Sequence, residues 1–218
     1  MRKRSYISYN LFFLIPFLLW VVVGGVLLLQ YSNRDLFFFI NSRHTDALDT
    51  FMFHTTWIGE GELIVAVLLG LMLLPRFRNR WYFIAALACN LLPFFIQQLL
   101  KSYFDSPRPI NYFKHAAWIH RADAWPELLY RSYPSGHSAG AFCFLCFLSL
   151  VLPPRYKWLG LAFFGIAMLV GYSRVYLAAH FFADVYAGSI IGTVFCVLFY
   201  SLIYLLKDRY SKEKGTFI

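Results

Sequence analysis

The chain has 218 residues, of which 60% are hydrophobic, 21% aromatic and only 14% charged. Soluble domains are usually about 45–50% apolar and about 25% charged, so this composition excludes an ordinary soluble domain of this size. It predicts a single domain, residues 1–218, in a lipid bilayer. The net charge is +9, but the Lys and Arg residues lie mostly between apolar runs, where they set topology and contact lipid head groups; we expect no nucleic-acid binding.

Six apolar stretches predict an all-α, polytopic membrane helix bundle with six transmembrane helices, because about 20 apolar residues cross a bilayer as a helix. In chain order they are Leu11–Gln30, Trp57–Pro75, Trp81–Leu100, Ser138–Pro153, Trp158–Tyr172 and Phe181–Leu206. The first follows three basic residues, Arg2, Lys3 and Arg4, but has no small-residue cleavage site behind it. We therefore expect a retained signal anchor.

Two segments between these stretches are expected to lie at the membrane surface. Asp35–His54 mixes polar and apolar residues and is typical of an interfacial helix. Pro109–Tyr133 interleaves Trp and Tyr with polar residues, a composition that settles at the head-group level. The cysteines lie inside apolar stretches and are expected to be small buried residues: Cys89, Cys143, Cys146 and Cys196.

The orientation follows from the Lys and Arg residues of the connecting segments. With the N-terminus inside, the cytoplasmic segments hold twelve of them and the outer segments eight. This bias places both termini in the cytoplasm and predicts a multi-pass protein of a cell membrane, the bacterial inner membrane, with its outer segments in the periplasm.

Three clusters of ionisable residues lie at the ends of the stretches: Lys101–Pro109, Pro134–His137 and Ser173–Asp184. With six spans, all three lie on one face of the membrane. The cations Lys101, Arg108 and Arg174 can therefore converge there with His137 and His180. A phosphate matches such a set, because guanidinium and ammonium groups donate to its oxygens. We therefore expect a phosphate-bearing membrane lipid as the substrate.

The same residues have the spacing for acid and nucleophile chemistry. His180 and Asp184 are four apart, on one helical face, so the carboxylate can accept the imidazole N–H and raise the nucleophilicity of the ring. Ser135 and Gly136 precede a predicted helix, whose first N–H groups can hold phosphate oxygens. His137 follows directly and can protonate a leaving alkoxide.

These clusters resemble the type 2 phosphatidic acid phosphatase superfamily, also called lipid phosphate phosphatases. The shared pattern is Lys, six residues, Arg-Pro; then Pro-Ser-Gly-His; then Ser-Arg, five residues, His, three residues, Asp. The matching residues span the core motif region 101–184: Lys101, Arg108, Pro109, Pro134, Ser135, Gly136, His137, Ser173, Arg174, His180 and Asp184.

The resemblance implies a hydrolase that needs no metal or other cofactor and works through a phosphohistidine intermediate. By this resemblance the catalytic residues are His180 as nucleophile, Asp184 as its partner and His137 as general acid. The implied phosphate-binding residues are Lys101, Arg108, Ser135, Gly136 and Arg174. The family's site faces the outer side of the membrane, in agreement with the charge bias.

Several alternatives stay open at the level of the sequence. The chain could be a phosphotransferase that uses the same intermediate, or a transport or scaffold protein with a phosphate pocket, although binding alone needs no acid–nucleophile pair. Vanadate-dependent peroxidases resemble this site, but those proteins are soluble. The substrate is equally open among undecaprenyl diphosphate, lipid A 1-phosphate, phosphatidylglycerol phosphate and phosphatidic acid. No obligate protein partner is indicated.

The remaining ionisable residues have simpler expected roles. Glu60 and Glu62 begin the second stretch and are expected to cap a helix rather than face the site. Asp105 could tether Arg108 or be an ordinary loop residue. The remaining four histidines are expected to be solvated at the membrane surface: His44, His54, His115 and His120.

Overall fold

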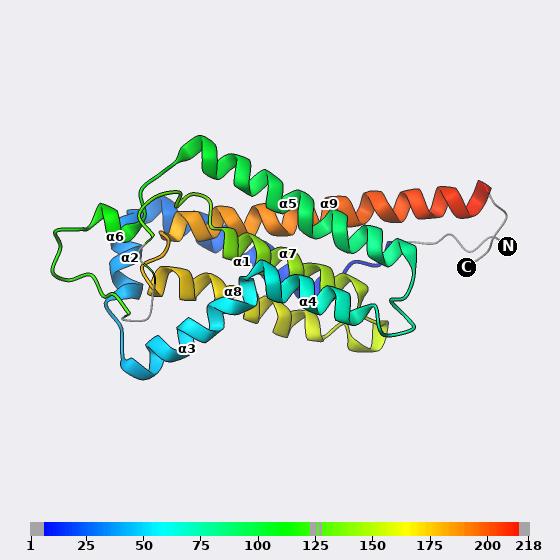
Figure 1. Ribbon diagram of the computed structural model, residues 1–218, viewed down its shortest axis with the longest axis horizontal. Helices are drawn as coiled ribbons and strands as arrows, with labels where there is room; N and C mark the ends of the chain where they lie inside the picture. Colours follow the sequence, from blue (N-terminus) through cyan, green and yellow to red (C-terminus); the bar gives the residue numbers. More distant parts are fainter. Residues whose placement is uncertain (1–6, 123–125, 127, 214–218) are drawn as a thin grey trace.

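The computed structural model describes residues 7–122, 126 and 128–213, and every regular element among them is helical. The elements form one elongated bundle (Figure 1). They are α1 (Leu11–Gln30), α2 (Asn33–Asn41), α3 (Asp46–Thr56), η1 (Trp57–Gly59), α4 (Gly61–Leu71), α5 (Arg80–Phe104), α6 (Pro109–Tyr112), α7 (Gly136–Val151), η2 (Pro154–Tyr156), α8 (Leu159–Tyr176) and α9 (Phe182–Glu213). Arg2, Lys3, Arg4 and Lys214, which entered the charge count, lie outside the described residues.

The predicted all-α membrane fold is confirmed, and the count of six spans holds approximately. Four described segments are long and apolar enough to cross a bilayer: Leu11–Gln30, Arg80–Tyr112, Leu159–Tyr176 and Phe182–Ser211. The helix pair α3–α4 passes the same test as one span that is bent by 56°. Helix α7 is apolar but has only 16 residues. The six apolar stretches thus correspond to four full-length helices, one bent pair and one short helix.

The helix pair found in place of the second predicted stretch has different bounds. It begins at Asp46, not at Trp57, because α3 continues through η1 into α4. The expected interfacial helix Asp35–His54 is two helices. Thr45 starts the second one, since its side chain accepts a hydrogen bond from the Leu48 N–H, as an N-cap does.

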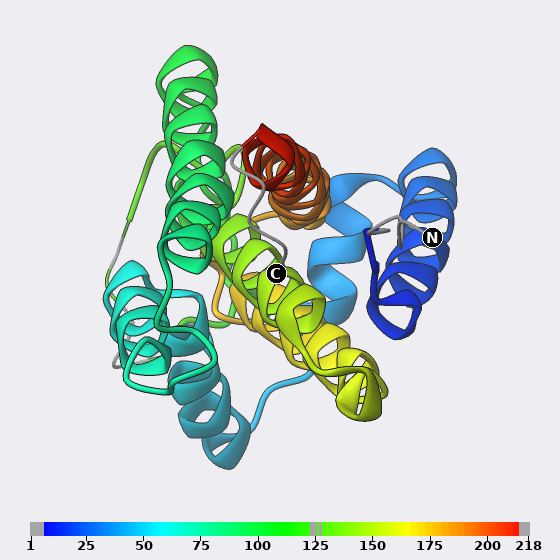
Figure 2. The same cartoon turned by 90° about the vertical axis from the view of Figure 1, so that its right-hand side faces the viewer.

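Helix α7 forms the centre of the bundle, packed against α5, α8 and α9 (Figure 2). Its close packing on α9 depends on glycines. A Cβ atom at Gly188 would lie 2.5 Å from the Ser135 carbonyl oxygen, and one at Gly192 would overlap the Ala139 carbonyl. Small residues let membrane helices approach this closely. The contact also joins the starts of α7 and α9, because the Ser135 N–H donates to the Asp184 carbonyl (3.0 Å).

We expect Gly192→Ala to destabilise the protein by about 1–3 kcal/mol, since overpacking a tight contact costs that much. The added methyl group has no room between α9 and α7. Gly165→Ala on α8 is the matched control, because nothing lies within 4 Å of its Cβ position. Thermal unfolding in detergent measures both. Equal melting temperatures for the two variants would show that the α7–α9 contact is not tight.

Candidate active site

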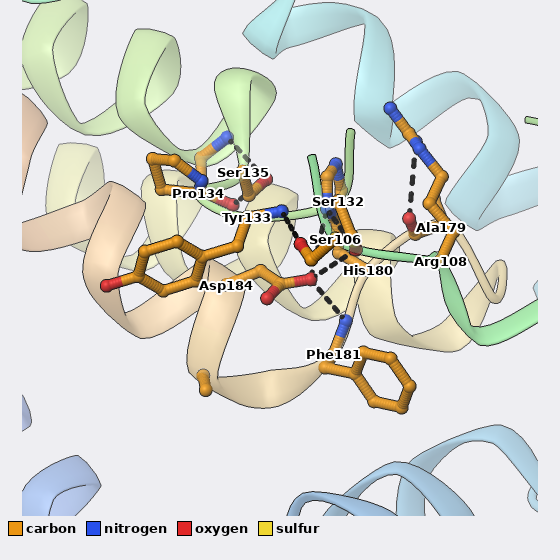
Figure 3. Close-up of polar contacts among 12 residues, drawn as sticks. Ser106, Arg108, Ser132, Tyr133, Pro134, Ser135, Ala179, His180, Phe181 and Asp184 are labelled. Carbon is orange, nitrogen blue, oxygen red and sulfur yellow. Dashed lines mark hydrogen bonds and ion pairs between the residues drawn. The ribbon is translucent and has the colours of Figure 1, made fainter. Parts of the chain in front are cut away.

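The three ionisable clusters meet at one end of the bundle, where α5 ends, α7 begins, and α8 turns into α9 (Figures 1 and 3). Lys101 lies in the last turn of α5, and Ser135 is the N-cap residue of α7. His180 lies in the turn between α8 and α9. The charges of Lys101, Arg108, Arg174 and His137 all act on His180. The structure therefore brings the predicted site residues together.

His180 and Asp184 form a buried pair. The exposed fraction of His180 is 1% and that of Asp184 is 4%. Asp184 Oδ2 lies 3.4 Å from His180 Nδ1, and it accepts hydrogen bonds from Ser132 Oγ (2.5 Å) and the Phe181 N–H (2.9 Å) (Figure 3). These two donors fix the carboxylate. With Nδ1 directed at Asp184, the Nε2 atom of His180 is the ring nitrogen available for chemistry.

The electrostatic environment keeps His180 neutral. Its burial, with the charges of Arg108, Arg174 and Lys101, holds the pKa of the imidazole well below its usual range. A neutral imidazole has a lone pair and can act as a nucleophile, whereas an imidazolium cannot. The cations that suit a phosphate thus also maintain the reactive form of His180.

The two arginines are buried and held by neutral oxygens. Arg108 donates from Nε to the Tyr130 carbonyl (2.9 Å) and from NH1 to the Ala179 carbonyl (3.2 Å). Arg174 donates from NH1 to Thr56 Oγ1 (2.6 Å). Asp105 does not tether Arg108; it is exposed and ends α5 in a left-handed conformation with φ of 35°. These oxygens help to hold both guanidinium groups at this end of the bundle.

The Pro134-Ser135-Gly136 turn presents the start of α7 to the same space. Ser135 caps the helix by accepting hydrogen bonds from the Ser138 N–H (3.3 Å) and hydroxyl (2.9 Å). Buried Gln97 of α5 donates to the Pro134 carbonyl (3.2 Å), and a Cβ at Gly136 would lie 3.3 Å from the Gln97 amide nitrogen. The first N–H groups of a helix have no acceptor within the helix and attract anions.

A cavity of about 500 Å³ lies beside this turn, between α4, α5 and α7. Lys101, Gly136 and His137 line one part of it, and apolar residues line much of the rest, among them Ile64, Val65, Leu91 and Phe94. Among the described residues, Glu60 is the acid in ion-pair range of His137, with its Oε1 3.6 Å from His137 Nε2. The cavity joins a polar end at the site to an apolar wall inside the membrane bundle.

Sequence reasoning missed four residues of this end of the bundle or misjudged them: Ser132, Thr56, Gln97 and Glu60. The Ser132 hydroxyl donates to Asp184, and the Thr56 hydroxyl accepts from Arg174. The Gln97 amide donates to the Pro134 carbonyl. No local pattern marks them. Glu60 was noticed but assigned to helix capping, and its side chain makes no capping hydrogen bond.

One of the other histidines also differs from expectation. His120 is half-buried and holds Asp49 through Nε2, 2.9 Å from each carboxylate oxygen, while Tyr176 donates to the same carboxylate (2.6 Å). The solvated role predicted for His120 is therefore wrong. His44, His54 and His115 are exposed, as predicted.

The fold and the site together define a membrane-embedded phosphatase. Residues 81–208, more than half of the chain, match the family model of the PAP2 superfamily, so the chain belongs to that superfamily of phosphatases. It is similar to an undecaprenyl-diphosphatase of Sulfolobus acidocaldarius, with 28% identity over 88% of this chain and 88% of the relative. The undecaprenyl-diphosphatase BcrC of Bacillus subtilis is 26% identical over 80% of this chain and 86% of its own.

A solved structure has the same fold. The crystal structure of LpxE from Aquifex aeolicus matches with a TM-score of 0.64 and 29% identity, over 78% of this chain and 94% of LpxE. The resemblance recognised from the three motifs is thus confirmed, as is the multi-pass membrane architecture.

Proposed function

We propose that this phosphatase hydrolyses a phosphate or diphosphate on a membrane lipid through a phosphohistidine intermediate on His180. The observation that carries the proposal is the buried His180–Asp184 pair, 3.4 Å apart, within the field of three cations. Lys101, Arg108 and Arg174 bind the phosphate oxygens together with the Ser135-Gly136 turn. Binding alone does not require a neutral histidine oriented by a carboxylate, so this pair favours turnover over a phosphate-binding scaffold.

In the first step, His180 Nε2 attacks phosphorus and the bond from phosphorus to the lipid oxygen breaks. His137 donates its proton to the departing oxygen, which leaves as an alcohol from a monoester or as a lipid monophosphate from a diphosphate. Asp184 stabilises the ring as it becomes charged. In the second step, water gives a proton to His137 as it attacks the phosphohistidine, the bond between phosphorus and Nε2 breaks, inorganic phosphate leaves, and His180 becomes neutral again. The positive groups stabilise the negative charge of both transition states.

Undecaprenyl diphosphate is the first candidate substrate. Two relatives that match more than three quarters of this chain are undecaprenyl-diphosphatases. The apolar wall of the cavity beside His137 can receive the first part of a long hydrocarbon chain, while the diphosphate lies among the cations. The other candidates share the phosphate but differ in the leaving group and the hydrocarbon chain: lipid A 1-phosphate, phosphatidylglycerol phosphate and phosphatidic acid.

The direct test is phosphate release by the purified protein in detergent from these four lipids, with and without EDTA. We expect release in the presence of EDTA, fastest from undecaprenyl diphosphate, because the described residues contain no group of three metal-ligand side chains and the phosphate is already surrounded by fixed cations. Loss of activity in EDTA with recovery in magnesium would contradict the proposal. Transfer of phosphate to an added lipid alcohol, without release, would identify a phosphotransferase.

We further propose that the site faces the outside of the membrane, with both chain ends in the cytoplasm. The charge bias supports this, and the site lies at the end of the bundle opposite the α4–α5 turn (Figure 1). The native cysteines are buried, so single introduced cysteines can be labelled selectively in intact cells. We expect Asp46→Cys to react with an impermeant thiol reagent and Arg78→Cys to react only after permeabilisation. The reverse pattern would invert the topology.

A further inference from the structure

Glu60 lies at the 56° bend where α3 and η1 meet α4. It occupies the N-cap position of α4, but its side chain makes no capping hydrogen bond. Instead, Oε1 lies 3.6 Å from His137 Nε2, across the gap between the bend and α7. His137 Nε2 is buried and has no hydrogen-bond partner within 3.5 Å among the described residues. Among the described residues, this carboxylate is therefore placed to accept a hydrogen bond from the protonated ring and to balance its charge.

Glycines hold the bend in this position. A Cβ atom at Gly59 would lie 2.7 Å from the His137 carbonyl oxygen and 3.1 Å from the His137 Cβ. A Cβ atom at Gly140, one turn further along α7, would lie 3.1 Å from the Gly59 carbonyl oxygen. The bend thus rests directly on the backbone of His137. Because Gly59 has no side chain, the next residue, Glu60, can bring its carboxylate to the imidazole.

The other charged groups around His137 are cations, so a carboxylate beside it would balance positive charge. Lys101 from α5, Arg108 from the loop before α6 and Arg174 from α8 act on His137 electrostatically, as does His180. A general acid must carry a proton, and a carboxylate beside an imidazole favours its protonated form. Glu62, two residues further on, lines the same cavity, but among the described residues no ion pair joins it to His137.

We propose that Glu60 is a positioning residue that orients His137 and keeps it protonated until the leaving group departs. This inference rests on the proposed general-acid role of His137. Each histidine then has its own carboxylate: Asp184 assists the nucleophile, and Glu60 assists the acid. A separation of 3.6 Å suits this role, since catalytic hydrogen bonds are often long without substrate and shorten in the reacting complex. Glu60 also acts on Arg174, so a counter-ion role for that arginine is the competing explanation.

The test compares Glu60→Gln with Asp46→Asn, a control at an exposed acid at the start of α3 that does not line the cavity, under single-turnover conditions in detergent. Two substrates are used: an alkyl lipid monophosphate, whose alkoxide needs a proton, and p-nitrophenyl phosphate, whose phenolate does not. We expect Glu60→Gln to lower the rate on the lipid about tenfold or more and on p-nitrophenyl phosphate less than about threefold. The alkaline limb of the pH–rate profile should move to lower pH by about one unit. Asp46→Asn should change neither.

Each other outcome has a definite meaning. An equal loss on both substrates, or a rise in KM with kcat and the pH profile unchanged, overturns the inference and assigns Glu60 to Arg174 or to the fold. Gly59→Ala provides a second variant that keeps the charge but displaces the bend; it should reproduce the dependence on the leaving group. If His137→Ala shows no such dependence, the general-acid role itself fails. If His137→Ala shows it and Glu60→Gln does not, only the inference about Glu60 fails.

Discussion

His180→Ala should abolish turnover on every substrate, with a loss of at least about 10⁴-fold. The nucleophile forms the bond to phosphorus, and removing a nucleophile typically costs several orders of magnitude. No described neighbour can replace it, because Ser132 donates its proton to Asp184 and both arginines are held by oxygens. The measurement is phosphate release from the lipid and from p-nitrophenyl phosphate.

The control is His54→Ala, which removes an exposed histidine of α3 that lies outside the site. Its activity should match that of the parent protein. Retention of more than about one hundredth of the parent activity by His180→Ala would mean that another group attacks phosphorus. A loss on the lipid alone would point to lipid binding instead of chemistry.

His137→Ala should lose activity to a degree that depends on the leaving group. General-acid catalysis typically contributes about 10²–10⁴-fold, and we expect a loss in that range on a lipid monoester. The loss should be at least tenfold smaller on p-nitrophenyl phosphate, because p-nitrophenolate departs without a proton. Single-turnover rates are the right measurement, since hydrolysis of the phosphohistidine could otherwise limit both reactions.

Two results would contradict this division of labour. If His137→Ala loses the same factor on both substrates, His137 does not protonate the leaving group. If His137→Ala is inactive while His180→Ala retains substantial activity, the roles of the two histidines are exchanged. His180→Ala is the internal comparison, since its loss should be the same for both leaving groups.

Much of the fold could be predicted because apolar runs of membrane length leave few alternatives to a spanning helix. The first span was predicted at its observed bounds, Leu11–Gln30. The second span was not, because α3 carries Asp46, Asp49 and His54 along a helix that nevertheless packs on α8. Its burial depends on a tertiary contact, and hydropathy alone cannot predict such a contact.

The site could be predicted where its chemistry is fixed by spacing. The four-residue interval from His180 to Asp184 predicts that they pair, and they do, although His180 lies in the turn before α9 and not on a helical face shared with Asp184. Ser132 could not be predicted, because a serine in a loop has no spacing that relates it to an aspartate 52 residues later. Glu60 was ambiguous, since the N-cap position suits any acid and only the contact of Gly59 with α7 directs it to His137.

The most direct test of the mechanism is to trap the intermediate. The parent protein and His180→Ala would be mixed with a lipid labelled in its terminal phosphate, quenched on the millisecond scale at alkaline pH, and digested for mass spectrometry. We predict phosphate on the peptide that carries His180, formed and lost at rates compatible with turnover, and none in His180→Ala. Phosphate on another residue, or release of phosphate in a fast first turnover with no labelled protein, would contradict a phosphohistidine at His180.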